Sequence, residues 1–467
     1  MSDNLIEKNG QWFDENGTRV WRAGTLVYYK RDLIKMFFWL YIGQFTFWMQ
    51  VSAFPVLLPL LFKHQGFSTA QTGMLLSTLP LGALIIFPIL GVMSDHTRTR
   101  FGRRRPFDLF TTPFWFVGLL VLPFAQSYWQ AFAAMILVGF AAAGSSVLDA
   151  FYNDVVPPEV MGRFVGGMRF LGAAGALLFN LYALSFFDTN PIAVFLVIAI
   201  VGFIGEMLML FNVKEGEYPP PPPKESVVKV VGEFIKEGFA NKYIIFLWLT
   251  MGVTAFGGPV MGTYFNLYFT DANTGLGLST AKLGQLLAMG TGIGMVLIIP
   301  CGWFVDRYGP KRLWGMSCFG VGVVQVLMFF VAKDMTSISI LYCIFAAVNT
   351  VTTAALLPLM YAFIPKDKFG QLSGSNRIVT SILQFVAVIA LGWMITLAGE
   401  NYSGLFIFGG IAYMLTPLFM WLMLKQPYPY GDLKTSMNPD GLAGQLRKSR
   451  AADEAESLAA GVADLEG

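Results

Sequence analysis

Twelve long apolar segments constrain the fold of this chain more than any other feature of its sequence. They lie at about residues 34–62, 69–93, 107–125, 128–156, 163–187, 191–211, 243–270, 280–304, 311–332, 335–364, 370–398 and 402–424. Each has at least about the 20 residues that a helix needs to cross the hydrocarbon core of a bilayer. Of all 467 residues, 55% are hydrophobic and 13% are charged, which is too apolar for a soluble domain. The sequence therefore predicts an all-α membrane protein with twelve transmembrane helices.

Basic residues alternate between the loops. The loops after even-numbered segments hold Arg98–Arg105, Arg163, Lys214–Lys242, Arg307–Arg312 and Lys366/Lys368, and the loops after odd-numbered segments have little basic excess. Short loops rich in Arg and Lys stay in the cytoplasm. We therefore expect a multi-pass protein of the inner (cytoplasmic) membrane with both termini in the cytoplasm.

Two motifs occur once in each half of the chain. The loop Gly91–Pro106 has a glycine, three residues, Asp95, a gap, Gly102 and then paired bases, and residues 302–312 repeat this order. The run Val156-Pro157, Gly162 and Arg169 returns as Ile364-Pro365, Gly370 and Arg377, at a constant offset of 208. Internal repeats of this kind indicate two six-helix halves related by an axis along the membrane normal.

The repeat divides the chain into five parts. We expect a cytoplasmic N-terminal arm at 1–33, six-helix halves at 34–211 and 243–424, a cytoplasmic linker at 212–242 and a cytoplasmic tail at 425–467. Within the linker, Pro219–Pro223 form a polyproline stiffener.

The basic loop also carries a family resemblance. Ser94-Asp95 and Arg100–Phe107 closely resemble the corresponding loop of the plant sucrose–proton symporters and their animal and bacterial relatives. Gln44-Phe45 and Gln50-Val51-Ser52 are similar to the first helix of the same group. These proteins belong to the major facilitator superfamily, beside the glycoside–pentoside–hexuronide cation symporters, which include melibiose permease. The resemblance spans about residues 34–424 and implies the major facilitator fold, a small polar solute such as a sugar or glycoside, and coupling to protons.

The chain departs from these relatives at informative positions. The second segment has no acid, whereas melibiose permease uses carboxylates there for its sodium site. Val138-Gly139-Phe140 stand where the plant symporters carry their proton-linked acid. Asp149, eight residues before Pro157, matches the spacing of the sugar-binding acid of melibiose permease. The resemblance therefore does not identify the sugar.

Charged and polar residues inside apolar segments are the candidates for solute binding and coupling, since a charge within the membrane is costly and usually functional. Asp149 and Arg169 lie at similar depth on neighbouring helices, so an ion pair between them is expected, with either a transport role or a structural role. Ser145, Tyr152 and Asn153 share a helical face with Asp149. The remaining candidates are polar or aromatic residues in other apolar segments: Gln44, Trp48, Gln50, Asn266, Asn349, Arg377 and Gln384.

A second group of residues is expected to form a cytoplasmic gate. It contains the charged residues and one glycine of the two repeated loops, with an acid and a base at the ends of the fourth and fifth segments: Asp95, Arg98, Gly102, Arg103, Arg104, Arg105, Asp154, Arg163, Asp306, Arg307 and Arg312. Charge pairs there would hold the inner ends of the two halves together until solute binds. Glu206 is either an interfacial acid or a protonation site.

The sequence contains no catalytic constellation, and its two histidines lie in loops. The three cysteines show no metal-ligand spacing, so we expect no metal, no cofactor and no enzyme activity. We expect a monomer that binds no nucleic acid. Two alternatives to a sugar symporter stay open: an exporter of drugs or amphiphilic metabolites on the same fold, and a membrane scaffold or sensor that does not transport.

Overall fold

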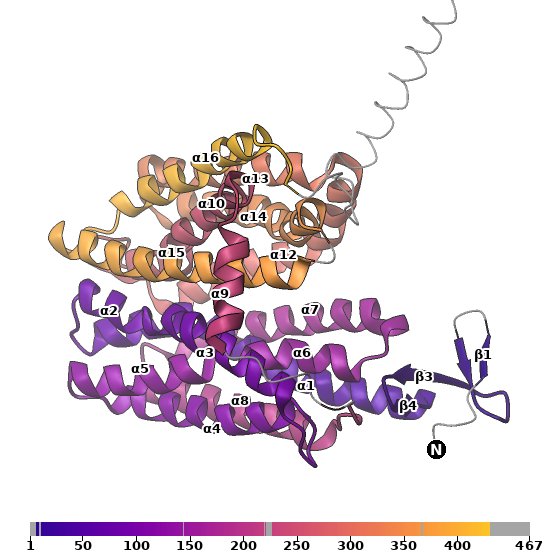
Figure 1. Ribbon diagram of the computed structural model, residues 1–467. Helices are drawn as coiled ribbons and strands as arrows, with labels where there is room; N and C mark the ends of the chain where they lie inside the picture. The colour runs from indigo at the N-terminus through magenta and orange to yellow at the C-terminus, as the bar shows by residue number, and fades with distance from the viewer. Residues whose placement is uncertain are drawn as a thin grey trace, which may run out of the picture. The chain divides into compact units, whose positions relative to one another are not determined.

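The computed structural model describes residues 6–8, 11–142, 144–218, 220, 227–365 and 368–429 (Figure 1). Most of the predicted C-terminal tail and of the proline run lies outside these residues. The side chains of two residues from the predicted solute site, Ser145 and Asp149, also lie outside the described part.

Eleven helices among the described residues are long and apolar enough to cross a membrane. Helix α5 (Tyr128–Ala142) is a shorter apolar helix, and α6 (Ser145–Val155) follows it within the fourth predicted segment. The prediction of twelve transmembrane segments in an all-α membrane core is thus confirmed. The other helices of the first sequence half are α1 (Lys30–His64), α2 (Thr69–Leu76), α3 (Thr78–His96), α4 (Arg105–Val121), α7 (Met161–Leu178) and α8 (Pro191–Asn212).

The second half begins with α9 (Val227–Gly238), which precedes the seventh predicted segment. The following elements are α10 (Lys242–Pro259), the π-turn η5 (Val260–Tyr264), α11 (Phe265–Thr270), α12 (Thr280–Tyr308), α13 (Pro310–Val331), α14 (Met335–Phe363), α15 (Phe369–Leu397) and α16 (Gly404–Leu424). Short turns also extend helices of the first half: η1 (Leu122–Phe124), η2 (Pro158–Val160), η3 (Phe179–Ala183) and η4 (Leu184–Phe186).

A small antiparallel sheet precedes the first helix, where we expected a polar arm and did not predict strands. Its strands, in spatial order, are β1 (Ile6–Lys8), β2 (Gln11–Phe13), β3 (Arg19–Ala23) and β4 (Leu26–Tyr28). An ion pair of 3.2 Å joins Arg19 to Glu159 beside α7. The backbone N–H of Glu217 donates to the hydroxyl of Thr25 at 2.8 Å. These contacts attach the sheet to segments that follow α6 and α8.

The chain forms two compact units. Unit 1 consists of Met1–Gly232, Gly258–Thr291 and Ser381–Leu405. Within it, α1 packs against α7 and α8, and α4 packs against α5 and α8 (Figure 1). Its apolar core includes Leu40, Phe151, Phe164 and Met209, which are almost completely buried. Where water is the alternative environment, full burial of one such side chain contributes roughly 1.5–3 kcal/mol.

Unit 2 consists of Glu233–Gly257, Gly292–Thr380 and Phe406–Gly467. Helices α13 and α14 pack closely within it. Trp248 and Trp314 are buried in its core, and the indole N–H of Trp248 donates to the carbonyl oxygen of Gly238 at 3.0 Å. The division of the chain into two repeated six-helix halves at 34–211 and 243–424 stays a proposal.

Candidate functional site

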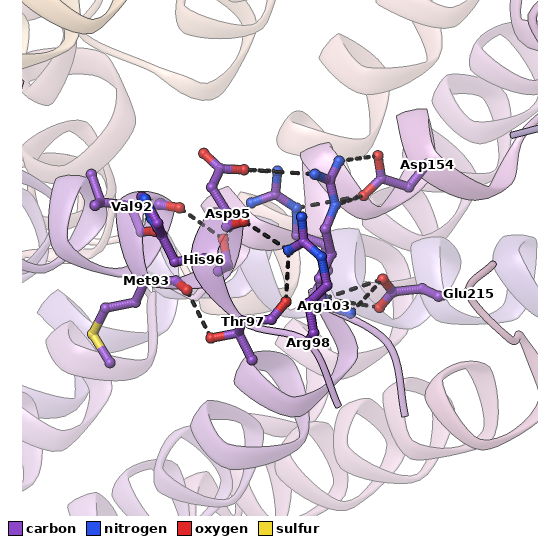
Figure 2. Close-up of polar contacts among 12 residues, drawn as sticks. Val92, Met93, Asp95, His96, Thr97, Arg98, Arg103, Asp154 and Glu215 are labelled. Atoms are coloured by element: carbon purple, nitrogen blue, oxygen red, sulfur yellow. Dashed lines mark hydrogen bonds and ion pairs between the residues drawn. The ribbon is translucent and has the colours of Figure 1, made fainter. Parts of the chain in front are cut away.

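The basic loop between α3 and α4 forms a network of ion pairs with the end of α6 (Figure 2). Arg103 donates to both carboxylate oxygens of Asp154, at 2.8 and 2.6 Å. This bidentate geometry fixes the direction of the guanidinium as well as its position. The hydrogen bond with Asp154 is the main reason that the pKa of Arg103 lies above its usual range.

Arg104 connects the same network to the end of α3. Its guanidinium donates to Asp95 at 2.5 Å and to the hydroxyl of Ser94, and it lies 3.5 Å from the carboxylate of Asp154. Arg104 is only 7% exposed, so its charge depends on these carboxylates for compensation. Asp95, Asp154, Arg103 and Arg104 are therefore in direct contact. All four belong to the first sequence half, so their part in a gate between the two halves stays a prediction.

Glu215, which follows α8, completes the network and was not predicted. Its carboxylate accepts backbone N–H groups from Arg103 at 2.9 Å, Arg104 at 3.0 Å and Arg105 at 2.7 Å (Figure 2). A negative charge at the N-terminus of a helix interacts favourably with its unpaired N–H groups and with its dipole. Glu215 thus stabilises the first turn of α4 from a distant part of the chain.

Gly102 allows this approach for two reasons. Its φ of +108° lies in a region that side chains other than glycine rarely adopt. A Cβ atom at this position would lie 2.5 Å from Cδ of Glu215, so any larger residue would displace the carboxylate. The glycine of the repeated motif therefore has a steric role at the α4 terminus.

Two other predicted gate residues of unit 1, Arg98 and Arg105, make hydrogen bonds to backbone oxygens beside this network. Arg98 donates to the carbonyl oxygens of Asp95 and Thr97, both at 2.8 Å, and so satisfies backbone acceptors at the C-terminus of α3. The guanidinium of Arg105 donates to the carbonyl of Phe101 at 3.4 Å. The side chain of Arg163 is exposed, and its part in a gate stays a prediction.

The corresponding loop in unit 2 has a different arrangement. Arg307 lies over the ring of Trp303, with 5.1 Å to the centroid. Asp306 and Arg312 are exposed, and in the described part of the chain neither takes part in an ion pair. The two repeats thus share a sequence pattern but differ in their contacts.

Three residues of the predicted solute site lie together in unit 1. The indole N–H of Trp48 donates to Oε1 of Gln44 at 3.1 Å, and the side-chain amide of Gln44 donates to the hydroxyl of Tyr152. Gln44 and Tyr152 are buried, whereas Trp48 is 41% exposed. The α1 residues Gln44 and Trp48 are one helical turn apart and share a face, and α6 supplies Tyr152. We call Gln44, Trp48 and Tyr152 the polar aromatic cluster.

The packing behind Trp48 limits its position. A Cβ atom on Gly172 of α7 would lie 2.7 Å from Cδ1 of the indole, so only a glycine leaves room for the ring there. The side-chain oxygen of Gln44 also accepts a hydrogen bond from the indole N–H. The exposed part of the ring is consequently an ordered apolar surface beside buried hydrogen-bonding groups.

Two further predicted residues make interhelical contacts. Gln50 is 1% exposed and donates to the carbonyl oxygen of Ile198 on α8 at 3.1 Å. Asn266 is also 1% exposed and donates to the carbonyl oxygen of Pro55 at 2.9 Å. Both contacts join α1 to another helix, and the predicted solute contacts of these two residues stay a proposal.

The remaining candidates lie on several helices, and their predicted solute contacts stay a proposal. Arg169, Asn153, Arg377 and Gln384 are exposed, and Asn349 is half-buried. Nothing is described of the side chains of Asp149 and Ser145, so their relation to Arg169 stays a prediction. Glu206 on α8 lies near the hydroxyl of Thr112 on α4. No group of three or more His, Cys, Asp or Glu residues among those described could hold a metal ion.

Comparison with known proteins gives a family match. A sequence model of the Major Facilitator Superfamily matches residues 40–388. The tetracycline resistance protein, class C, of Escherichia coli is 24% identical, over 75% of this chain and 87% of that protein. The D-xylose transporter of Levilactobacillus brevis is 22% identical, over 78% of this chain and 86% of its own length. The raffinose permease of Escherichia coli is 22% identical, over 84% of this chain and 92% of that protein.

Solved structures show the same fold. The nucleoside transporter NupG has a TM-score of 0.66 and 14% identity, and the comparison covers 84% of this chain and 100% of that one. A D-xylose-proton symporter has a TM-score of 0.61 and 16% identity, and the comparison covers 85% of this chain and 99% of that one. At this level of identity the likeness concerns the fold alone.

Proposed function

The chain belongs to the Major Facilitator Superfamily, and on that premise we propose that it is a proton-coupled symporter of a sugar or glycoside that works by alternating access. Membership of this superfamily and similarity to known transporters indicate that the protein is a multi-pass membrane transporter and not an enzyme. The alternating basic loops support an inner-membrane location with both termini in the cytoplasm.

The polar aromatic cluster is the observation that supports a sugar most directly. A pyranose has an apolar face of C–H groups and a rim of hydroxyls, so it suits an aromatic ring beside hydrogen-bonding side chains. Trp48 offers such a ring, its indole N–H donates to Gln44, and Gln44 donates in turn to Tyr152. The names of two relatives, a D-xylose transporter and a raffinose permease, favour the same solute class.

Transport assays on purified protein in proteoliposomes test this proposal. We expect an inward proton gradient to drive accumulation of labelled raffinose or D-xylose, and an equal sodium gradient to have no effect. Trp48→Leu should weaken the apparent affinity at least tenfold, which corresponds to about 1.4 kcal/mol. Trp48→Phe, which keeps a ring, should weaken it less. The matched control is Trp129→Leu, because Trp129 is 73% exposed and lies outside the cluster.

The tetracycline resistance relative favours a second candidate, an exporter of drugs or amphiphilic metabolites. The same vesicles separate the two functions. Proton-driven movement of tetracycline without any sugar accumulation would replace the sugar proposal with the exporter. Loss of sugar uptake in Trp129→Leu equal to that in Trp48→Leu would remove the polar aromatic cluster from the proposal.

A further inference from the structure

A second group of charged residues lies at the end of unit 1 where α1 finishes and α2 begins. Lys63 occupies the last turn of α1, and Thr69 begins α2. Asp271 follows α11, and Glu400 lies between α15 and α16. The helices α2 and α3 together span 28 residues, or about 42 Å, so this end is far from the basic loop that follows α3.

The first contact here is an ion pair between distant parts of the sequence. The ammonium of Lys63 pairs with Oδ2 of Asp271 and lies 5.0 Å from the centre of the Tyr402 ring. The other oxygen of Asp271 accepts the backbone N–H groups of Asn273 and Thr274, both at 2.8 Å. Because the backbone orients the carboxylate, little side-chain freedom is lost when Lys63 binds it.

The second contact is centred on Glu400. Its Oε1 accepts the backbone N–H of Thr69 at 3.2 Å and the hydroxyl of Thr396 at 3.0 Å. Its Oε2 accepts the hydroxyls of Thr69 and, at 3.1 Å, of Tyr402. The carbonyl oxygen of Glu400 accepts the hydroxyl of Thr274 at 2.6 Å. One residue thus links the start of α2, the end of α15 and the segment after α11.

The backbone of Glu400 is strained in this position. Its φ is +60°, and it is the single residue other than glycine with a positive φ among those described. Such strain is maintained where surrounding contacts require it, and it is common at functional sites. The hydrogen bonds of Glu400 with Thr69 and Thr274 hold its backbone in this conformation.

The helices below these charges approach each other at backbone distance. A Cβ atom on Gly73 of α2 would lie 2.7 Å from the carbonyl oxygen of Val388 on α15. A Cβ atom on Gly392 would lie 2.7 Å from the carbonyl oxygen of Thr69. The hydroxyl of Tyr264 donates to Val388 at 2.5 Å in the same place. No solute can pass between α2 and α15 at this crossing.

A third connection lies between η4 and α12. The backbone N–H of Thr280 donates to Asp188 at 3.0 Å, and its hydroxyl donates to the carbonyl oxygen of Leu184 at 2.7 Å. Like the first two contacts, it joins a segment of the first sequence half to a segment of the second half within unit 1.

We propose that Lys63, Thr69, Asp271 and Glu400 form a latch that holds the two sequence halves closed at the end opposite the basic loop, and that must break before solute enters from that side. This inference rests on the alternating-access part of the proposed function. An outward opening would separate α1 and α2 from the segments after α11 and α15. Both charge-centred contacts would then be lost together.

Thiol labelling tests the latch without any substrate. The background carries Cys301→Ser, Cys318→Ser and Cys343→Ser, with Ala387→Cys as a reporter, since Ala387 is 0% exposed and precedes Val388 in α15. A membrane-impermeant maleimide is applied from the side of Lys63. We expect Glu400→Gln and Asp271→Asn each to raise the labelling rate at least threefold, and the exchanged pair Lys63→Asp with Asp271→Lys to lower it again.

Asp334→Asn is the matched control, because Asp334 also accepts backbone N–H groups at a helix start but joins only neighbouring residues of α14. Its labelling rate should equal that of the background. Unchanged labelling in both Glu400→Gln and Asp271→Asn, with elution on gel filtration like the parent, would overturn the latch. If the latch variants respond as expected but the parent accumulates no sugar, then the solute proposal fails and the latch remains.

Discussion

The side-chain amide of Asn266 donates a hydrogen bond of 2.9 Å to the carbonyl oxygen of Pro55. In a regular helix this oxygen would accept the backbone N–H of residue 59, but residue 59 is a proline and has no N–H. An unpaired carbonyl inside a membrane protein is costly, and a neighbouring helix often satisfies it. Asn266 therefore compensates in α11 for a proline in α1.

A double-mutant cycle tests this compensation. Asn266→Ala should lower the free energy of unfolding by about 1–3 kcal/mol, because it leaves the buried oxygen of Pro55 unpaired. In a Pro59→Ala background the loss should be about 1 kcal/mol smaller, since the substituted residue then has a backbone N–H of its own to donate. Thermal unfolding in detergent measures both values. Gln384→Ala, which removes an exposed amide, is the control, and an equal loss in both backgrounds would contradict the compensation.

The sequence predicted the membrane helices well because each needs only a long apolar run. It also predicted that Asp154 joins the loop arginines, since both lie at the same end of their segments. It did not predict that Glu215 accepts three N–H groups at α4, because no periodicity records which acid a loop brings to a helix start. The sheet before α1 was missed because strands of three to five residues carry little pattern.

Contacts between distant segments were the least predictable. Lys63 and Asp271 are 208 residues apart, and only the packing of α1 against α11 brings them together. In the sequence each looks like an ordinary charge in a loop. Asn266 was recognised as a polar residue in an apolar segment, but its spacing could not show that its partner is a backbone oxygen of α1.

The ion pair between Arg103 and Asp154 leads to a prediction on transport. Asp154→Asn should reduce the transport rate about tenfold and change solute affinity less than about twofold, because it weakens one conformational state and leaves the polar aromatic cluster intact. Initial uptake rates and equilibrium binding separate these effects. The control is Glu159→Gln, which breaks the exposed pair with Arg19 and should change both quantities little. An equal loss of binding and transport would contradict a gate role.

The strained backbone of Glu400 gives a prediction on stability. Glu400→Ala and Glu400→Gly both remove the carboxylate, but only glycine adopts a positive φ without strain. Glu400→Gly should therefore be more stable than Glu400→Ala by about 1 kcal/mol in thermal unfolding. The same two substitutions at Asn401, which has no positive φ, should show no advantage of glycine. Equal stability of the two Glu400 variants would show that the strain is absent.

The latch should also depend on pH. Burial raises the pKa of the Glu400 carboxyl, but hydrogen bonds from Thr69, Thr396 and Tyr402 outweigh this effect, so the pKa lies below its usual value. The pKa of Asp271 is lowered in the same way: burial raises it, and Lys63 with the N–H groups of Asn273 and Thr274 outweighs the burial. Stabilisation by either carboxylate is therefore present above the unfolded-state pKa, at about 4, and is lost as the pH falls through the lower pKa of the closed latch.

Thermal unfolding of the parent and of Glu400→Gln between pH 3 and 8 (roughly the range around the carboxyl pKa values) measures this contribution. The difference in stability should be constant at neutral pH and should shrink towards zero under acid conditions. The charged and titratable groups around Glu400 are Lys63, Asp271 and Tyr402, and Asp271→Asn should remove part of the remaining pH dependence. A difference that grows on acidification would mean that Glu400 does not stabilise the closed end through its negative charge.

Asp149 carries the prediction on energy coupling. In the sequence it precedes Tyr152, a member of the polar aromatic cluster, by three residues, and this spacing predicts a shared helical face. The hydroxyls of a solute bound at that cluster would compete with Arg169 for the carboxylate of Asp149. Solute occupancy would then affect the protonation of Asp149. Asp149→Asn keeps the shape and the hydrogen-bonding capacity of the side chain but cannot titrate. We expect it to abolish accumulation of sugar against a gradient, and to leave binding weaker and independent of pH.

A purely structural pair with Arg169 makes a different prediction for the same variant. It predicts a poorly folded Asp149→Asn protein, because an arginine would lose its counter-charge within the membrane, and recovery of folding when Arg169→Gln is added. Gel filtration and thermal unfolding of the single and double variants distinguish this outcome from a loss of coupling. Counterflow, in which labelled sugar exchanges without net proton movement, should persist in folded Asp149→Asn protein if only coupling is lost. Uphill accumulation by that folded variant would exclude Asp149 as the proton site and would direct attention to Glu206, the acid of α8 that lies near Thr112 of α4.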